Sequence, residues 1–199
     1  MPNMSNESTK TLTTLEYVIL GLIGTEPQSG YSLITTFESG IKRWSASPGS
    51  IYPTLKRLEQ QGIIAGKLEM TYETRPRKMY TLTPLGEELL DSWLRAPLTK
   101  NEIGESRDVV LIKFLFAEKR LTREEILAWL DNYAQGTADY RALILMQGGP
   151  ANVAWSVHQR LLAEEAMMEL DMQSTWIERA RRRLLGEVEQ ASPPGENRA

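Results

Sequence analysis

Apolar residues recur at helical spacing in two segments near the start of the chain. From Thr13 to Gly24 they repeat every three or four positions, and Thr13 with Glu16 three residues later makes a capping box. A turn around Pro27 follows, after which Ser29 is placed to cap a second amphipathic run. The pattern therefore predicts two short helices joined by a tight turn.

A third helix is predicted from Ser47 to Gly62. Ser47 is a suitable N-cap, Pro48 suits the first helical position, and Gly62 can adopt the left-handed conformation that ends a helix. Because Pro53 removes a backbone hydrogen bond, a later start near Tyr52 is an alternative. One face is apolar and is expected to pack inward, whereas the other is small, polar and basic, which suits approach to phosphate oxygens and base edges. The inward positions are Ile51, Leu55 and Leu58, and the outward positions are Ser50, Pro53, Thr54, Lys56 and Arg57.

After the third helix, the period changes from helical to alternating. Ile64 with residues 67–72, and then residues 78–82, suit the two strands of a hairpin. The tip between them carries Arg75 and Arg77 around a proline, and arginine binds phosphate bidentately or enters a minor groove. These features predict a wing that contacts a nucleic acid, with a solvated hairpin turn as the alternative.

The second half of the chain has helical periodicity throughout. Residues 107–117 are apolar enough to be largely buried. Thr122 starts a long helix through another capping box, and the Gly-Gly-Pro sequence at 148–150 breaks that helix after Gln147. A second long helix is predicted within residues 152–185. The apolar faces of these two antiparallel helices exceed what the pair can bury, which predicts an oligomer interface.

These patterns together predict a mainly α-helical protein of two domains. Thr83 and Pro84 start a fourth helix that ends near Ala96, and Pro97 is a natural boundary. The expected order is a disordered N-terminus (1–12), a winged helix-turn-helix domain with a two-stranded β-wing (13–96), an all-α dimerisation domain (97–190) and a disordered tail (191–199).

Charge is distributed unevenly along the chain. The formal net charge is −3, yet residues 41–80 contain eight basic and three acidic side chains, a local charge of +5. The absence of cysteine excludes disulfides and thiolate metal sites and fits a reducing compartment. No apolar run reaches the roughly 20 residues of a membrane span, and the polar start lacks the hydrophobic region of a signal peptide. A cytoplasmic protein with a local basic patch is therefore expected.

The chain offers little for catalysis. It has one histidine, His158, no cysteine, and no glycine-rich phosphate loop after a strand. No metal-ligand spacing surrounds His158, so a structural role is expected for it. The sequence therefore predicts no enzyme activity, no metal and no cofactor.

Four sequence blocks occur in order across residues 13–90. They are LEYVILGL at 15–22, SGYSL at 29–33, PGSIYPTLKRL at 48–58 and RPRKMYTLT at 75–83. Together they resemble the successive blocks of PadR-family transcriptional regulators. The resemblance implies a winged helix-turn-helix homodimer that binds a palindromic operator, usually as a repressor. It also keeps Pro53 inside the third helix or at its shoulder.

The resemblance implies roles for individual residues. The third helix is expected to enter the major groove of double-stranded DNA, and binding should weaken steeply with salt as counterions are released. Some small members of the family stack planar compounds on a tryptophan of the helix after the wing, which makes Trp93 a candidate contact for a small aromatic or phenolic effector; a core or interface role is the alternative. The expected DNA contacts are Tyr31, Ser47, Gly49, Ser50, Tyr52, Pro53, Thr54, Lys56, Arg57, Arg75, Arg77 and Lys78.

The sequence thus predicts a sequence-specific DNA-binding regulator of transcription, acting as a repressor that a small aromatic effector releases. The alternative is a winged-helix adaptor module for protein interaction, whose basic face is merely solvated. Such a module would dimerise without binding a specific duplex.

Overall fold

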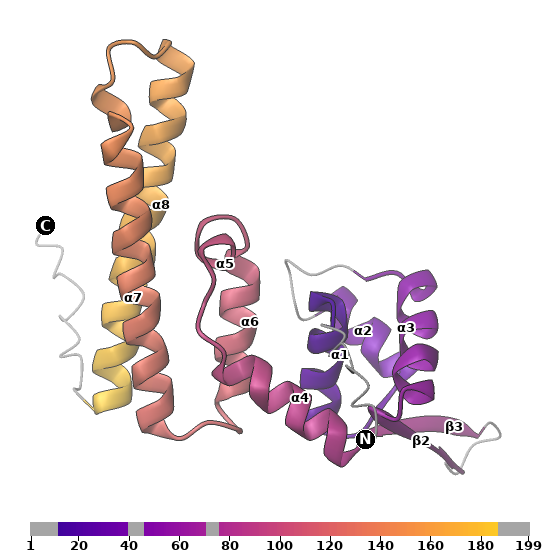
Figure 1. The fold of residues 1–199 in the computed structure, drawn as a ribbon. Helices are drawn as coiled ribbons and strands as arrows, with labels where there is room; N and C mark the ends of the chain where they lie inside the picture. The colour runs from indigo at the N-terminus through magenta and orange to yellow at the C-terminus, as the bar shows by residue number, and fades with distance from the viewer. Residues whose placement is uncertain (1–11, 40–45, 71–75, 187–199) are drawn as a thin grey trace, which may run out of the picture. The chain divides into compact units, whose positions relative to one another are not determined.

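Helices account for most of the fold (Figure 1). A computed structural model describes residues 12–39, 46–70 and 76–186. The fold is mainly α-helical with one small antiparallel sheet, which confirms the predicted class. In chain order the elements are α1 (Thr14–Thr25), β1 (Gln28–Ser29), α2 (Gly30–Ser39), α3 (Pro48–Gln60), β2 (Ile64–Glu69), β3 (Arg77–Leu82), α4 (Pro84–Arg95), α5 (Lys100–Gly104), α6 (Arg107–Ala117), α7 (Arg123–Met146), the 3-10 turn η1 (Gly149–Ala151) and α8 (Val157–Leu185).

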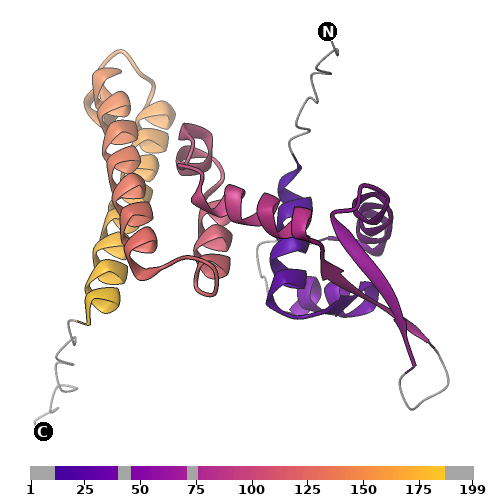
Figure 2. The ribbon, with the colours of Figure 1, turned by 60° about the horizontal axis from the view of Figure 1, so that its bottom comes forward.

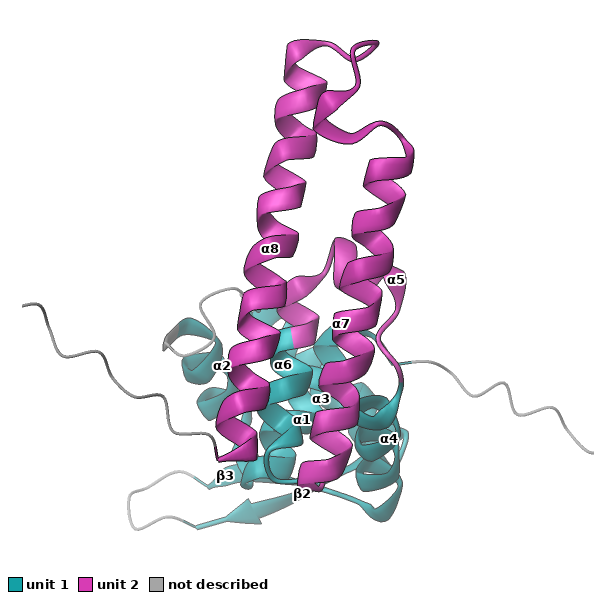
Figure 3. Cartoon of the chain, turned by 90° about the vertical axis from the view of Figure 1, so that its left-hand side faces the viewer, with its two compact units in different colours: residues 1–96, 111–120 teal, residues 97–110, 121–199 magenta. Residues whose placement is uncertain are grey.

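The described chain divides into two compact units (Figure 3). The first contains the residues up to Ala96 together with Leu111–Arg120, and the second contains Pro97–Val110 and the residues from Leu121 onward. The division falls inside α6, so the second half of the chain contributes a segment to the first unit. Of the two ends predicted to be disordered, residues 1–11 and 191–199 lie outside the described residues, whereas Leu12 is buried.

Helix α1 begins at the predicted capping box. The backbone N of Glu16 donates to Thr13 Oγ1 at 3.3 Å, and the backbone N of Thr13 donates to Glu16 Oε2 at 2.7 Å. Val18, Ile19 and Leu20 are all fully buried, because α1 packs against both α4 and β3. The prediction of this helix is confirmed, with each end displaced by one residue.

Ser29 caps α2 as predicted, but it also belongs to a strand that was not predicted. The backbone N of Ser32 donates to Ser29 Oγ at 3.0 Å, and the backbone N of Ser29 donates to Ser32 Oγ at 2.8 Å. Gln28 and Ser29 form β1, which pairs with Tyr80 and Met79 of β3. The sheet order is β1-β3-β2. A two-residue strand is too short to show an alternating pattern in the sequence.

Strands β2 and β3 form the predicted hairpin. They are antiparallel and pair in register from Ile64 opposite Leu82 toward the tip. In Figure 2 the hairpin projects away from α1, α2 and α3. Residues 71–75, which include Arg75 and most of the predicted wing tip, lie outside the described residues.

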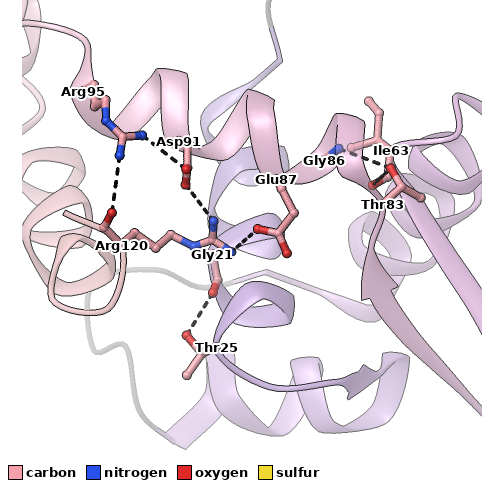
Figure 4. A network of polar contacts seen from close by, with 9 residues as sticks. All are labelled: Gly21, Thr25, Ile63, Thr83, Gly86, Glu87, Asp91, Arg95 and Arg120. Carbon is pink, nitrogen blue, oxygen red and sulfur yellow. Dashed lines mark hydrogen bonds and ion pairs between the residues drawn. The ribbon is translucent and has the colours of Figure 1, made fainter.

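Thr83 joins the start of α4 to the end of α3. Its hydroxyl lies 2.6 Å from the Gly62 carbonyl oxygen. The hydroxyl also lies 2.9 Å from the Ile63 carbonyl oxygen and accepts from the backbone N of Gly86 at 3.2 Å (Figure 4). A Cβ on Gly86 would lie 2.2 Å from the Ile63 oxygen, so only glycine fits there. Gly62 has a φ of 69°, the left-handed conformation predicted to end α3.

The returning segment, residues 111–120, packs on α1 within the first unit. The side chain of Phe116 is 6% exposed. A Cβ on Gly21 would come within 2.2 Å of the Phe116 ring, so the absence of a side chain at Gly21 creates the space that this ring fills. The fold of the first unit therefore depends on a residue that lies beyond Pro97, the domain boundary predicted from the sequence.

The second unit is built on the two long antiparallel helices that were predicted, α7 and α8 (Figure 3). Thr122 and Ser156 form the capping boxes that start them. Gly148, with a φ of 95°, ends α7 in the predicted Gly-Gly-Pro break. Helix α5, which packs on α7, was not predicted.

Aromatic residues fill the interface between α7 and α8. The Tyr133 ring is buried, with its centroid 5.8 Å from that of Trp129 and 6.4 Å from that of Trp176. Burial raises the pKa of the Tyr133 hydroxyl. Ion pairs between Arg141 and Asp171 and between Arg181 and Asp131 also join the two helices.

Candidate nucleic-acid interface

The first turn of α3 presents short side chains. Ser47 is the N-cap, as predicted, but its hydroxyl makes no capping bond. Ser50 closes the turn instead, because its backbone N and its Oγ both donate to the Ser47 carbonyl oxygen, at 2.9 and 2.8 Å. Gly49 is exposed, and among the described residues a Cβ there would meet only Ser47 Oγ, at 3.6 Å. The turn leaves room for close approach to the positive end of the helix dipole.

Pro53 lies inside α3, exposed on its surface. The helix begins at Pro48, so the alternative start near Tyr52 is wrong. The cost of Pro53 is one backbone hydrogen bond, because its nitrogen has no hydrogen to donate to the Gly49 carbonyl four residues earlier.

Two exposed tyrosines lie where α2 meets α3. Tyr52 is 52% exposed and Tyr31 is 67% exposed. The Tyr52 ring packs against the start of α2, since a Cβ on Gly30 would be 2.5 Å from the ring. Gly30 therefore allows the two helices to approach closely.

Thr54 does not face outward, and that expectation is wrong. Its side chain is 5% exposed, and its Oγ1 donates to the Ser50 carbonyl oxygen at 2.7 Å. Thr54 follows Ile51 by three residues and precedes Leu58 by four, so it extends the buried stripe that these residues form with Leu55. Its hydroxyl is already bonded within the helix.

Four basic residues of the predicted contact set lie among the described residues. Lys56 and Arg77 are exposed. Lys78 makes an ion pair of 2.7 Å with Glu59, and its ammonium lies 5.5 Å from the Tyr80 ring centroid. Arg57 is turned back toward α1, where it contacts Glu16. The fifth residue, Arg75, falls outside the described residues.

Trp93, the candidate effector contact, is half-buried and stacked on Tyr17. The two ring centroids are 4.7 Å apart and the planes differ by 3°. The ammonium of the buried Lys113 lies 5.1 Å from the Trp93 ring centroid. Burial, with a smaller contribution from the Glu16 charge, raises the pKa of Tyr17. The family resemblance pointed to Trp93 but to neither of these partners.

Arg120 binds two acidic residues of α4 (Figure 4). It donates to Asp91 Oδ1 at 2.7 Å and to Glu87 Oε2 at 2.5 Å, and Arg95 pairs with Asp91 at 3.2 Å. Burial alone would raise the pKa of Asp91, but the hydrogen bonds from Arg120 and Arg95 outweigh it and lower that pKa. Residues 33 and 29 positions apart meet here, so no local pattern could reveal the contact.

The described residues of each unit border a cavity, and Trp93 lines neither of these two. One, of about 240 Å³ in the second unit, lies between α5 and α7 and is bordered by Ile103, Gly136 and Tyr140. The other, of about 220 Å³ in the first unit, lies beside α1 and is bordered by Leu22, Thr36 and Phe116. Among the described residues no cluster of acidic, histidine or cysteine side chains is arranged to hold a metal ion. No described helix is long and apolar enough to span a membrane.

Residues 19–92 match the transcriptional regulator PadR-like family. The negative transcriptional regulator PadR of Bacillus subtilis is 38% identical over 81 residues, which cover 40% of this chain and 44% of that protein, less than half of its length. A crystal structure of a PadR-like regulator from Bacillus cereus is 36% identical, covering 40% of this chain and 77% of that one with a TM-score of 0.36. The structure of Bacillus subtilis PadR with operator DNA is 23% identical, covering 87% and 98% of the two chains with a TM-score of 0.44. Through its winged-helix segment, the chain belongs to the PadR-like family of transcriptional regulators.

Proposed function

We propose that this protein regulates transcription by sequence-specific binding to double-stranded DNA, as a repressor that a small aromatic effector releases. The observation that carries the proposal is the surface of α3, where an open, polar first turn lies beside exposed basic residues. Membership of a family of transcriptional regulators supports this use of the helix, and the name of the curated relative, a negative regulator, favours repression.

In this proposal α3 reads the major groove and the β2–β3 hairpin serves as the wing. Serine hydroxyls and the basic side chains contact phosphates and base edges, while the exposed tyrosines lie at the margin of the contact. Thr54 is left out because it is buried, and Arg57 because it pairs with Glu16. The proposed contacts are Tyr31, Ser47, Gly49, Ser50, Tyr52, Pro53, Lys56, Arg75, Arg77 and Lys78.

In this proposal the protein acts as a homodimer. Leu161, Met168 and Met172 of α8 follow one another at helical spacing and are 52%, 71% and 48% exposed. A second copy of the chain would bury this face, as in other paired long helices. The dimer would then bind a palindromic operator with half-sites about 10 base pairs apart or at a multiple of that spacing.

The proposed effector is a small aromatic compound, for which Trp93 is the candidate contact. The half-buried Trp93 ring already belongs to an aromatic stack with Tyr17, which a planar aromatic effector would join. A phenolic acid is the class to test first, because p-coumaric acid is the compound present in a structure of Bacillus subtilis PadR. The proposal assigns no catalytic activity or cofactor and places the protein in the cytoplasm, where its DNA target lies.

The competing function is that of a winged-helix adaptor that binds another protein. It predicts the same dimer and the same exposed basic residues, but no preference for one duplex sequence. Binding to the DNA upstream of the protein's own coding sequence separates the two functions.

The deciding experiment titrates the protein against a fluorescent duplex of that upstream region and against a scrambled duplex, each at two salt concentrations. We expect selective binding that weakens steeply with salt. Equal weak binding to both duplexes would support the adaptor and reject the proposed function.

A charge substitution tests the assigned surface. Gly49→Glu adds a carboxylate to the open first turn of α3, where it favours the helix dipole but repels phosphate. We expect it to keep thermal stability and abolish operator binding. Gln60→Glu, which adds the same charge at the other end of α3, should weaken binding far less.

A further inference from the structure

Arg57 and Glu16 join α3 to α1. Arg57 Nε donates to Glu16 Oε1 at 3.0 Å, and the Nη2 atom lies 2.9 Å from the same oxygen. The two residues are 41 positions apart. Glu16 belongs to the capping box of α1, and Arg57 lies in the last turn of α3. The pair therefore connects the helix proposed to read DNA with the start of the first helix.

Both oxygens of the Glu16 carboxylate are occupied. Oε2 accepts from the backbone N and from Oγ1 of Thr13, at 2.7 and 2.8 Å, while Oε1 accepts from Arg57. The side chain of Glu16 is only 6% exposed, compared with 46% for Arg57. Burial would raise the pKa of Glu16, but the bonds from Thr13 and Arg57 outweigh it and lower that pKa. The carboxylate is thus charged, largely buried and dependent on Arg57 as its counterion.

A buried charge constrains its partner. If Arg57 moved to a DNA phosphate, the Glu16 carboxylate would remain buried without its counterion, which is strongly unfavourable. The negative charge of Glu16 beside the guanidinium also opposes the approach of a phosphate.

The ion pair of Lys78 with Glu59, which also involves the C-terminal end of α3, provides a contrast. Its side chains are 41% and 30% exposed, so water can solvate either charge after the pair separates. Lys78 can therefore exchange Glu59 for a phosphate at little cost, whereas Arg57 cannot exchange Glu16.

We infer that Arg57 is a positioning residue for α3, held by Glu16, and not one of the residues that contact DNA. This inference rests on the proposed function. By fixing the last turn of α3 against α1, the pair sets how far and at what angle the first turn of α3 presents Ser50 and its neighbours to the groove. Arg57 accordingly adds to the preference for the operator and not to general attraction for DNA.

Two substitutions with the same change of charge test this inference. Glu16→Gln can keep the capping box, because glutamine also serves at that position, but it removes the counterion of Arg57. Glu59→Gln removes the counterion of Lys78. We expect Glu16→Gln to weaken operator binding by roughly tenfold, the size of coupling seen within one salt-bridge network, and Glu59→Gln to bind at least as tightly as the unmodified protein. Tighter operator binding by Glu16→Gln would overturn the inference.

The salt dependence of Arg57→Ala gives a second test. A lost phosphate contact lowers the slope of log K against log salt concentration by about one, because one fewer counterion is released. We expect Arg57→Ala to weaken operator binding, while the salt slope and the affinity for the scrambled duplex stay unchanged. The double variant with Glu16→Gln should bind the operator no more weakly than either single variant. A lower slope, or additive losses, would make Arg57 a phosphate contact.

Hydrogen exchange of the DNA-free protein separates this inference from the proposed function. In both Glu16→Gln and Arg57→Ala, the amides of the last turn of α3 should exchange faster, while those of α8 should not change. If the unmodified protein fails to prefer its operator, the proposed function fails. Unchanged exchange in the last turn of α3 would instead reject the positioning role by itself.

Discussion

Phe116→Ala tests whether residues 111–120 belong to the core of the first unit. Phe116 is 6% exposed, and complete burial of such a side chain contributes about 1.5–3 kcal/mol of transfer free energy. The cavity left behind adds to the loss, which brings Phe→Ala substitutions to about 3–5 kcal/mol. Because Gly21 has no side chain to move into the space, we expect a value near the middle of that range, about 4 kcal/mol.

Hydrogen exchange measured on the full chain is the appropriate assay, because the two units need not unfold together. A loss of about 4 kcal/mol lowers the protection of the most stable amides about a thousandfold. We expect that loss in α1 and α4, with α7 and α8 retaining their protection. Leu115→Ala is the matched control: this side chain is 54% exposed, so α1 should keep its protection to within about 1 kcal/mol.

Unchanged exchange of α1 in Phe116→Ala would show that residues 111–120 do not belong to the core of the first unit. Equal effects of Phe116→Ala and Leu115→Ala would lead to the same conclusion, because these neighbouring residues of one helix differ in burial.

Two further predictions concern ion pairs of the first unit. Arg120→Ala should lower the free energy of unfolding by about 1–2 kcal/mol, because hydrogen bonds to charged groups are lost but the acidic partners are partly exposed to water. Urea denaturation measures this loss, and an unchanged midpoint would contradict the prediction. The pKa values of Glu16 and Asp91 are lowered in the folded protein, so their contribution to stability is complete above their unfolded pKa values of about 4 and is lost as the pH falls through the lower folded values. The urea midpoint should therefore stay constant between roughly pH 7 and 5 and fall below about pH 4, less steeply in Glu16→Gln. An identical fall in that variant would show that Glu16 does not contribute to the pH dependence of stability.

Much of the proposed interface could be predicted from the sequence because it depends on neighbouring residues. Ser47 with Pro48 marks the start of α3, and Gly62 with a φ of 69° marks its end. The first turn of that helix then presents small polar groups whatever the helix packs against. One exception is Thr54, where two signals compete: its residue type suggests an exposed position, but its spacing from Ile51 and Leu58 places it in the buried stripe.

The elements with local signals follow from the residue pattern alone: the capping boxes at Thr13 and Thr122, the glycines that end α3 and α7, and the apolar stripes between them. Each depends on hydrogen bonds and packing within a few residues, so the pattern of residue types is sufficient. Which distant residues meet depends on the folded chain. Strand β1 exists because β3 lies beside it, Phe116 fills the space that Gly21 leaves, and Arg57 turns to Glu16. Those contacts join residues far apart in the chain, and their partners are chosen by the folded backbone and by the cost of leaving a buried charge or cavity unfilled.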